Sequence, residues 1–280
     1  MIPDWKTNKV YYSFQSTYDF NPELRELRKY LKQNNFKYGH IAGTKDYFCR
    51  DYMPIQLTKN EFVQFKFQPD YLLNKVKSQI FVTDTNNVLK KNEFLRRLNI
   101  INAEIILDGG NIIKSENKVI VTDKVAKDNN LTIEQIRSKL ESIFKAKVII
   151  VPSYPKEETG HADGILRFIN NNTVLTINLD NEVNEWKEIL ICEIKKANLK
   201  LISLPKANSP EQDWRYINYL QVGKTIIVPT FKNNRNSDKI IIPFMKNLFT
   251  QYNYCVETID ADKISENGGV LNCFTWNIIE

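Results

Sequence analysis

The feature that most constrains the fold is a near-regular spacing of polar and glycine-bearing motifs along the 280 residues. Successive motifs are 51 to 58 residues apart, and strand-like and helix-like segments alternate between them. The motifs are CRDYMP at Asp51, LDGGN at Gly109, GHAD at His161, RYINY at Asn218 and GGVLNC at Gly269. Five units of this length predict a closed, propeller-like array in which equivalent strand ends converge on one axis.

The segments between the motifs favour an α/β fold. Apolar runs rich in β-branched and aromatic residues, such as KVIVTD, AKVIIVP, KTIIVPTF and GGVLNCFTW, are typical of strands. A helix is predicted from Asn21 as its cap, with Leu24, Leu27 and Leu31 on one face. Another should begin behind a Thr132 cap. Because no low-complexity linker divides the chain, we expect one domain over residues 1–280.

Composition argues against several classes of protein. The net charge of +6 comes from lysines and arginines spread along the chain, so a nucleic-acid partner is not favoured. No apolar run approaches the roughly 18 residues of a membrane span, and the first residues lack a secretory signal pattern. We therefore expect a cytoplasmic protein without a membrane partner, and a homo-oligomer is compatible with the sequence.

Four cysteines and two histidines make a metal site improbable, because no pair of cysteines has metal-ligand spacing. In a reducing compartment the cysteines should be free thiols. Cys49, Cys192 and Cys255 are interpreted as ordinary thiols, Cys49 being placed in the core on a strand. His40 is interpreted as structural, and Arg50 as a structural ion-pair partner.

The residues expected to converge form a chemically coherent set. They are Asp51, Asp108, His161, Asp163, Asn218 and Cys273. A cysteine with a histidine is a nucleophile with its proton-transfer partner. Nearby carboxylates disfavour a thiolate unless the substrate is a cation. A guanidinium offers five N–H donors in a planar fork, and two carboxylates, naturally Asp51 and Asp163, could grip it.

Five segments together resemble one family. TKDYFCRDYMP, LDGGN, TGHADGILRF, YINYLQVGKTIIVPTF and GGVLNCFTW occur in the order found in agmatine deiminases and bacterial peptidyl-arginine deiminases. The resemblance runs from about Thr44 to Trp276. It implies the pentein fold, a five-bladed α/β propeller of pseudo-fivefold ββαβ-type repeats, and a hydrolytic deiminase that needs neither a metal nor an organic cofactor.

The resemblance also implies roles for individual residues. Cys273 matches the nucleophile that attacks the guanidinium carbon, and His161 matches the general acid and base. Asp51 and Asp163 match the carboxylates that bind the guanidinium. Further contacts to substrate are expected from Asn218 at the site rim, from Asp108, from Gly109 and Gly110 through close backbone approach, and from Phe48 and Trp276 as apolar walls.

The two catalytic-type residues of GHAD, His161 and Asp163, are two positions apart. On an extended segment their side chains would point to the same side, so both could reach one substrate. The interpretation assigns the imidazole to the reacting carbon and the carboxylate to a guanidinium N–H.

The sequence departs from the family at several positions. Asp108 stands where Glu is usual, Asn272 where His is usual, and Phe48 where many agmatine deiminases carry Trp. Three functions therefore stay open: deimination of agmatine or an agmatine-like small guanidinium, deimination of arginine in a peptide, and a non-catalytic binding module on the same scaffold. The partner is then a small guanidinium compound or an arginine-containing peptide.

Overall fold

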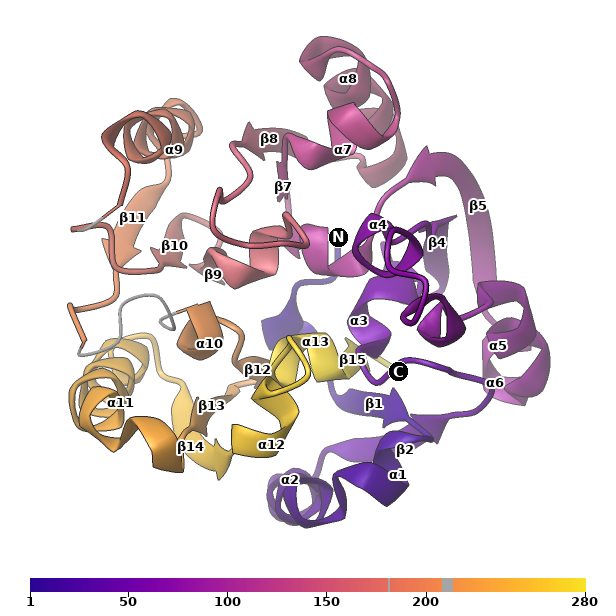
Figure 1. The fold of residues 1–280 in the computed structure, drawn as a ribbon, viewed down its shortest axis with the longest axis horizontal. Helices are drawn as coiled ribbons and strands as arrows, with labels where there is room; N and C mark the ends of the chain where they lie inside the picture. Colours follow the sequence, from indigo (N-terminus) through magenta and orange to yellow (C-terminus); the bar gives the residue numbers. More distant parts are fainter. Residues whose placement is uncertain (181, 208–213) are drawn as a thin grey trace.

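The computed structural model describes residues 1–180, 182–207 and 214–280. The described residues form five three-stranded sheets arranged around a common axis, as Figure 1 shows. In each sheet the middle strand pairs antiparallel with the strand on one side and parallel with the strand on the other. The expected α/β propeller of ββαβ units is thus confirmed.

The blades follow one another along the chain. The first contains β15 (Thr275–Ile278), β1 (Lys9–Ser13) and β2 (Lys37–Ile41); the second contains β3 (Ile55–Gln56), β4 (Glu61–Lys66) and β5 (Asn99–Ile106). The third contains β6 (Ile113–Lys114), β7 (Lys118–Thr122) and β8 (Lys147–Val151); the fourth contains β9 (Leu166–Asn170), β10 (Thr173–Thr176) and β11 (Lys200–Ser203). The fifth contains β12 (Leu220–Val222), β13 (Thr225–Thr230) and β14 (Cys255–Asp260).

Each parallel pair is joined by a helical crossover. Most of the crossover helices lie on the outside of the ring, whereas α4 (Asp70–Leu73) lies nearer the axis (Figure 1). The crossovers are, in order, α1 (Ser16–Asp19) with α2 (Asn21–Gln33); α4 (Asp70–Leu73), η2 (Gln79–Phe81), α5 (Thr85–Lys91) and α6 (Glu93–Arg96); α7 (Lys124–Asp128) with α8 (Ile133–Phe144); α9 (Asn184–Lys196); and η6 (Lys232–Asn234) with α11 (Arg235–Thr250). The apolar faces of the longer crossover helices pack on the sheets because the strands alone leave that surface exposed, whereas α4 and η2 bury no residue.

The predicted helix caps and strands agree with the structure only in part. The Thr132 cap is confirmed, because its hydroxyl accepts from the Gln135 N–H and the Gln135 side chain returns the bond. The Asn21 cap is wrong, since Asn21 already lies inside α2 and Phe20 precedes it. Leu24, Leu27 and Leu31 are buried as predicted. The GGVLNCFTW run is only partly a strand, because α13 (Leu271–Phe274) comes before β15.

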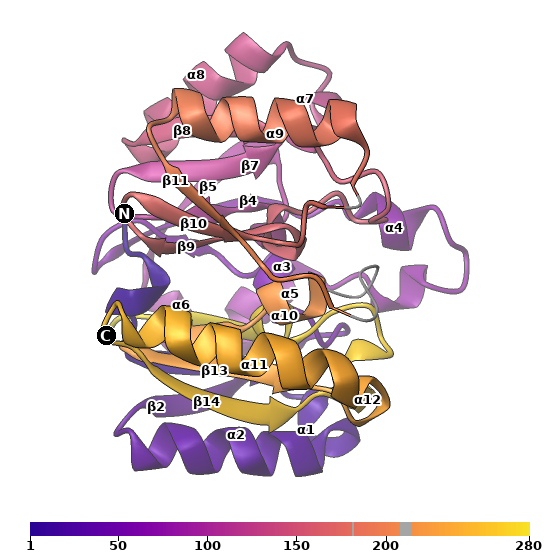
Figure 2. The same ribbon diagram turned by 90° about the vertical axis from the view of Figure 1, so that its left-hand side faces the viewer.

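Short helical turns, rather than strand ends, converge at one end of the axis. One turn precedes the first strand of every blade: α3 (Cys49–Tyr52), η3 (Gly109–Asn111), η4 (Ala162–Gly164), α10 (Trp214–Ile217) and α13. Neighbouring turns touch, in the order α13, α3, η3, η4 and α10. Figure 2 shows this end on the right, with α12 (Asp262–Ser265), and the chain termini at the opposite end with η1 (Asp4–Lys6).

Chain closure occurs in the first blade. β1 lies between β15 and β2, with Lys9 opposite Ile278 and Tyr12 opposite Thr275. The last strand of the chain is therefore hydrogen-bonded to the first, and this pairing completes the ring.

Candidate active site

A cavity of about 470 Å³ opens at the end of the axis where the five turns meet. Six of the residues selected from the sequence line it: Phe48, Asp51, His161, Asp163, Asn218 and Cys273. They come from four different turns, so the five-unit spacing did bring their side chains together. One wall is formed by the arm, defined here as residues 69–82, which contains α4 and η2 and projects from this end in Figure 2.

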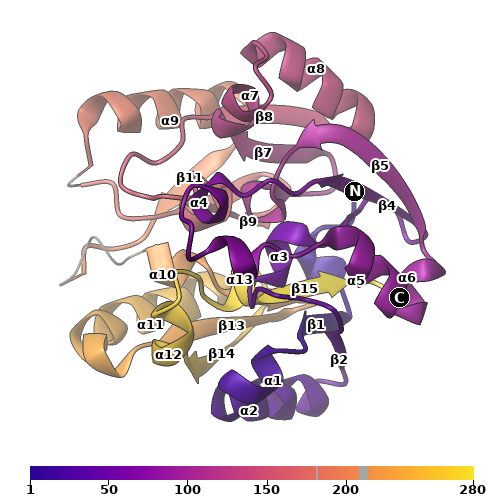
Figure 3. The same cartoon turned by 45° about the vertical axis from the view of Figure 1, so that its right-hand side comes forward.

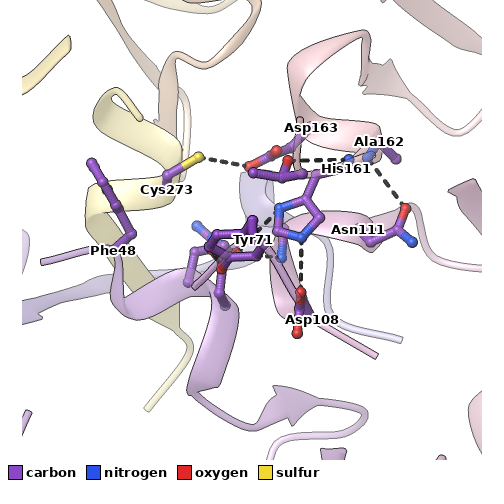
Figure 4. A network of polar contacts seen from close by, with 12 residues as sticks. Phe48, Tyr71, Asp108, Asn111, His161, Ala162, Asp163 and Cys273 are labelled. Atoms are coloured by element: carbon purple, nitrogen blue, oxygen red, sulfur yellow. Dashed lines mark hydrogen bonds and ion pairs between the residues drawn. The ribbon is translucent and has the colours of Figure 1, made fainter. Parts of the chain in front are cut away.

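The thiol of Cys273 is held by two polar groups. It donates to Asp163 Oδ2 at 3.3 Å (Figure 4). The Asn218 side-chain amide donates to the sulfur at 3.0 Å. Burial and the negative charges of Asp163 and Asp51 raise the pKa of Cys273 well above its usual value, against the opposing effect of Asn218. In the free protein the group is therefore a thiol.

Asn218 lies deeper than its predicted place at the site rim. It is buried, and its Oδ1 accepts the backbone N–H groups of both Asn272 and Cys273 at 3.1 Å. The same side chain thereby fixes the backbone of α13 and contacts the sulfur. Its physical role is to hold the Cys273 thiol in place.

Asn272, which stands where the family usually has His, serves the neighbouring carboxylate. Its Nδ2 donates to Asp163 Oδ2 at 2.7 Å, and that same oxygen accepts the Cys273 thiol. A neutral amide at this position orients Asp163 without adding charge to the site.

His161 lies between two carboxylates. Its Nε2 is 3.0 Å from Asp108 Oδ2 (Figure 4). Its Nδ1 is 3.6 Å from Asp51 Oδ1. Burial acts to lower the pKa of His161, but the charge of Asp51, the hydrogen bond and charge of Asp108, and the charge of Asp163 together raise it to about 10. At neutral pH the ring is an imidazolium with a proton available for donation.

The Asp51 carboxyl is a weaker acid than an ordinary aspartic acid. Burial raises its pKa to about 7, with His161 opposing and Asp108 and Asp163 adding to the shift. The carboxylate accepts the backbone N–H of Gly110 at 2.9 Å and the hydroxyl of Tyr71 at 3.1 Å. Its position is set by α3, on which Cys49 also lies, so the placement of Cys49 on a strand is wrong although its burial is confirmed.

The two glycines of LDGGN are required by neighbouring chain segments. A Cβ on Gly109 would lie 2.0 Å from the backbone oxygen of Arg50. A Cβ on Gly110 would lie 2.4 Å from Asp51 Oδ1 and 2.7 Å from His161 Nδ1. Neither glycine lines the cavity, so the close approach that they permit is to α3 and the imidazole.

Three further expectations need correction. Asp108 lies behind the imidazole and outside the cavity lining. Trp276 is buried in the core, where its indole N–H donates to the Pro54 carbonyl, because β15 turns it away from the site; Trp214 lines the cavity instead. His161 and Asp163 are not on an extended segment, since Asp163 belongs to the turn η4.

Arg50 is buried, and its side-chain hydrogen bonds go to neutral acceptors. Its Nε donates to the carbonyl oxygen of Asn272, and Nη2 donates to Asn277 Oδ1 at 2.5 Å. No salt bridge within the described residues includes it, in contrast to the ion pair that was predicted. The bond to Asn272 ties α3 to the segment that carries Cys273.

Two residues of the site were missed. Asn111, quoted within LDGGN but not selected, accepts the N–H groups of Thr122 and Ala162 on its Oδ1 and so locks η3 to η4 (Figure 4). Tyr71 comes from the arm and contacts Asp51. The described residues contain no group of three or more His, Cys, Asp or Glu placed to hold a metal ion, and no helix among them is long and apolar enough to cross a membrane.

Five mixed sheets about an axis, with a thiol, an imidazole and carboxylates at one end, define a pentein. The chain belongs to the Porphyromonas-type peptidyl-arginine deiminase family, whose model matches residues 20–278. The expected relationship to bacterial peptidyl-arginine deiminases is thereby confirmed.

Solved structures share the fold. The agmatine deiminase of C. jejuni is 22% identical with a TM-score of 0.72, over 100% of this chain and 95% of that one. The agmatine deiminase of Enterococcus faecalis is 15% identical, with a TM-score of 0.72, over 99% and 94%. A cysteine-to-serine mutant of DDAH from Pseudomonas aeruginosa, complexed with citrulline, is 13% identical, with a TM-score of 0.59, over 97% and 99%. No curated protein sequence shows significant similarity to the chain.

Proposed function

We propose that the chain is a hydrolytic deiminase of a guanidinium substrate, with Cys273 as nucleophile. The observation that supports this most directly is that Cys273, His161, Asp51 and Asp163 line one cavity. Their arrangement supplies a thiol for attack, a proton donor, and two carboxylates for a planar cation. Agmatine or a similar small guanidinium compound is the proposed substrate.

The charges of the site favour a cationic substrate. Asp51 and Asp163 act against ionisation of Cys273 in the free protein. A guanidinium bound between those carboxylates would offset their charge and lower the pKa of the thiol. Nucleophile activation would then depend on the arrival of the correct ligand, which protects the thiol from other electrophiles.

The proposed chemistry has two steps. In the first, the Cys273 thiol releases its proton to water, Sγ bonds to the guanidinium carbon and a C–N bond breaks. His161 donates a proton to the departing amine, so that NH₃ leaves and an amidino-cysteine cation remains. In the second, the oxygen of a water molecule bonds to the same carbon as the C–S bond breaks; one proton of that water passes to His161 and the other to the departing sulfur. The products are a ureido compound and the restored thiol.

A peptide substrate is the alternative, and one feature of the arm favours it. Leu73, Val76, Ile80 and Phe81 are exposed on the arm, and Phe81 also lines the cavity. Exposed apolar side chains beside a cavity are typical of a surface that contacts a larger ligand. Arginine within a peptide could place its guanidinium in the site and its neighbours against these side chains, giving citrulline as product.

The test is formation of ammonia and ureido product from agmatine, free arginine and an arginine-containing peptide, with Cys273→Ala as control. Turnover of one substrate that disappears in the variant would support a cysteine-dependent deiminase of that class. Partner binding without turnover of any of these compounds, unchanged in Cys273→Ala, would instead support the non-catalytic binding module.

A further inference from the structure

Tyr71 reaches the site from an element that carries none of the proposed catalytic residues. It lies on α4 within the arm, where residues 73–77 are exposed while Tyr71 and Leu72 are half-buried against the cavity. Figure 3 shows α4 in front of the ring of turns, and Figure 4 shows the Tyr71 ring beside His161.

The side chain contacts two members of the site at once. Its hydroxyl donates to Asp51 Oδ2 at 3.1 Å, and its ring meets the His161 ring edge-on with centroids 5.7 Å apart. The other oxygen of Asp51 accepts the N–H of Gly110 and faces His161 Nδ1. Because Gly110 holds one oxygen and Tyr71 the other, the Tyr71 hydroxyl fixes the orientation in which the Asp51 carboxylate would meet a guanidinium.

The hydroxyl is a dependable donor. Burial and the charges of Asp51 and Asp108 raise the pKa of Tyr71 well above its usual value, so the proton stays on the phenol. A hydroxyl that donates to a carboxylate favours its ionised form. Asp51 needs this assistance, because burial raises its own pKa to about 7.

Two ion pairs hold the arm on the third blade. Asp70 is 2.9 Å from Lys124 at the start of α7, and Lys75 is 2.5 Å from Glu158 in the segment that leads to His161. At least one partner of each pair is well exposed, and exposed ion pairs contribute little stability. These two pairs place the arm beside the segment that leads to His161.

We propose that Tyr71 is a positioning residue for the reaction: its hydroxyl holds Asp51 oriented and ionised for the guanidinium, and its ring supports His161. The proposal rests on the proposed function, since it assigns Asp51 as a clamp. It makes the arm part of the working site in addition to being its wall.

The first measurement is the pH profile of kcat/KM for Tyr71→Phe, which keeps the ring and removes the hydroxyl. We expect kcat/KM to fall about tenfold, mainly through a higher KM, and its acidic limb to move to higher pH. The matched control is Tyr18→Phe, because Tyr18 is 72% exposed and is not among the described residues that line the cavity. A Tyr71→Phe enzyme with the parent's KM and pH profile would overturn the proposal.

A second measurement does not depend on turnover. The chain has only two histidines, so His40→Gln assigns the imidazole NMR signals of His161. These signals should report the titration of Asp51, 3.6 Å away, with a midpoint near pH 7. In Tyr71→Phe the midpoint should rise; an unmoved midpoint in folded protein contradicts the role of Tyr71. If the midpoint rises but no guanidinium compound is turned over, the proposed function fails and the assignment of Tyr71 to Asp51 stands.

Discussion

The thiol of Cys273 donates to the same Asp163 oxygen that accepts the Asn272 amide. The sulfur and the side chain of the preceding residue therefore share one acceptor atom, which belongs to a proposed guanidinium clamp. This relationship makes the thiol a weak acid until a cation engages Asp163, and it leads directly to the first prediction.

Alkylation should distinguish Cys273 from the exposed thiols. With iodoacetamide at pH 8, we expect Cys273 to react at least about tenfold more slowly than exposed Cys192, because only the thiolate reacts. Asp163→Asn should accelerate the reaction of Cys273, since it removes a charge that raises the pKa. Peptide mapping by mass spectrometry gives both rates, with Asp180→Asn, an exposed carboxylate, as control. Equal rates in the Asp163→Asn variant and the parent would contradict this electrostatic explanation.

His161 should stay protonated far above the usual range of histidine. NMR titration of the imidazole should give a pKa near 10, lowered by at least about one unit in Asp51→Asn. Because the folded-state pKa exceeds the ordinary value of 6.5, the proton stabilises the fold fully below pH 6.5, and this contribution is lost as the pH rises through 10.

Denaturant unfolding at pH 6, 8 and 10 tests the same linkage. The parent should lose more unfolding free energy across this range than Asp51→Asn, in which part of the stabilisation of the imidazolium is already absent. A parent and variant with parallel pH dependence would show that the Asp51 charge does not support the proton on His161.

Gly110→Ala should damage the site more than the fold. The added methyl would meet Asp51 Oδ1 at 2.4 Å and His161 Nδ1 at 2.7 Å, so both side chains must shift. Displacements of this kind cost on the order of a hundredfold in rate, measured here as kcat/KM for whichever guanidinium compound is turned over.

Alanine substitutions at two other glycines should have a larger and a smaller effect on folding than Gly110→Ala. Gly109→Ala should impair folding, because the obstructing atom is the backbone oxygen of Arg50 at 2.0 Å. Gly164→Ala should fold normally, since the nearest atom to its Cβ is 4.0 Å away. Thermal unfolding of the three variants compares them, and a stable Gly109→Ala protein would show that α3 and η3 are not packed as described.

Asn111→Ala should destabilise the protein by about 2 to 4 kcal/mol, because the buried N–H groups of Thr122 and Ala162 both lose their acceptor. Activity should fall as well, since η4 carries Asp163. The control is Asn117→Ala, a substitution at an exposed turn. Urea denaturation gives the two free energies, and similar small losses would exclude a locking role for Asn111.

The motif spacing was enough to predict which residues meet, because each blade contributes one turn to the same end of the axis. It could not predict Tyr71, which is one of 13 tyrosines and lies in a crossover with no recognisable motif. Its contact with Asp51 depends on how residues 69–82 run across the open end of the ring, and nothing in the local residue pattern specifies that course.

Trp276 and Asn218 show a related limit. Closeness to Cys273 along the chain suggested that Trp276 lines the site, but β15 begins at Thr275 and directs the indole toward Tyr11 and Phe62. Asn218 was placed at the rim although it follows α10 directly and points at the sulfur. The direction in which a side chain points at the end of a short turn depends on tertiary packing, and the spacing of residues along the chain does not predict it.

The pairing of β1 with β15 has a consequence for the order of assembly. Contacts between residues so distant along the chain are slow to form, because a loop of almost the whole chain must close first. Cys273 lies on α13 directly before β15. The pairing of β15 with β1 therefore also brings the sulfur next to the site residues of the other blades. We therefore expect folding intermediates with four blades in place to be chemically inert, and competence to arise only with ring closure.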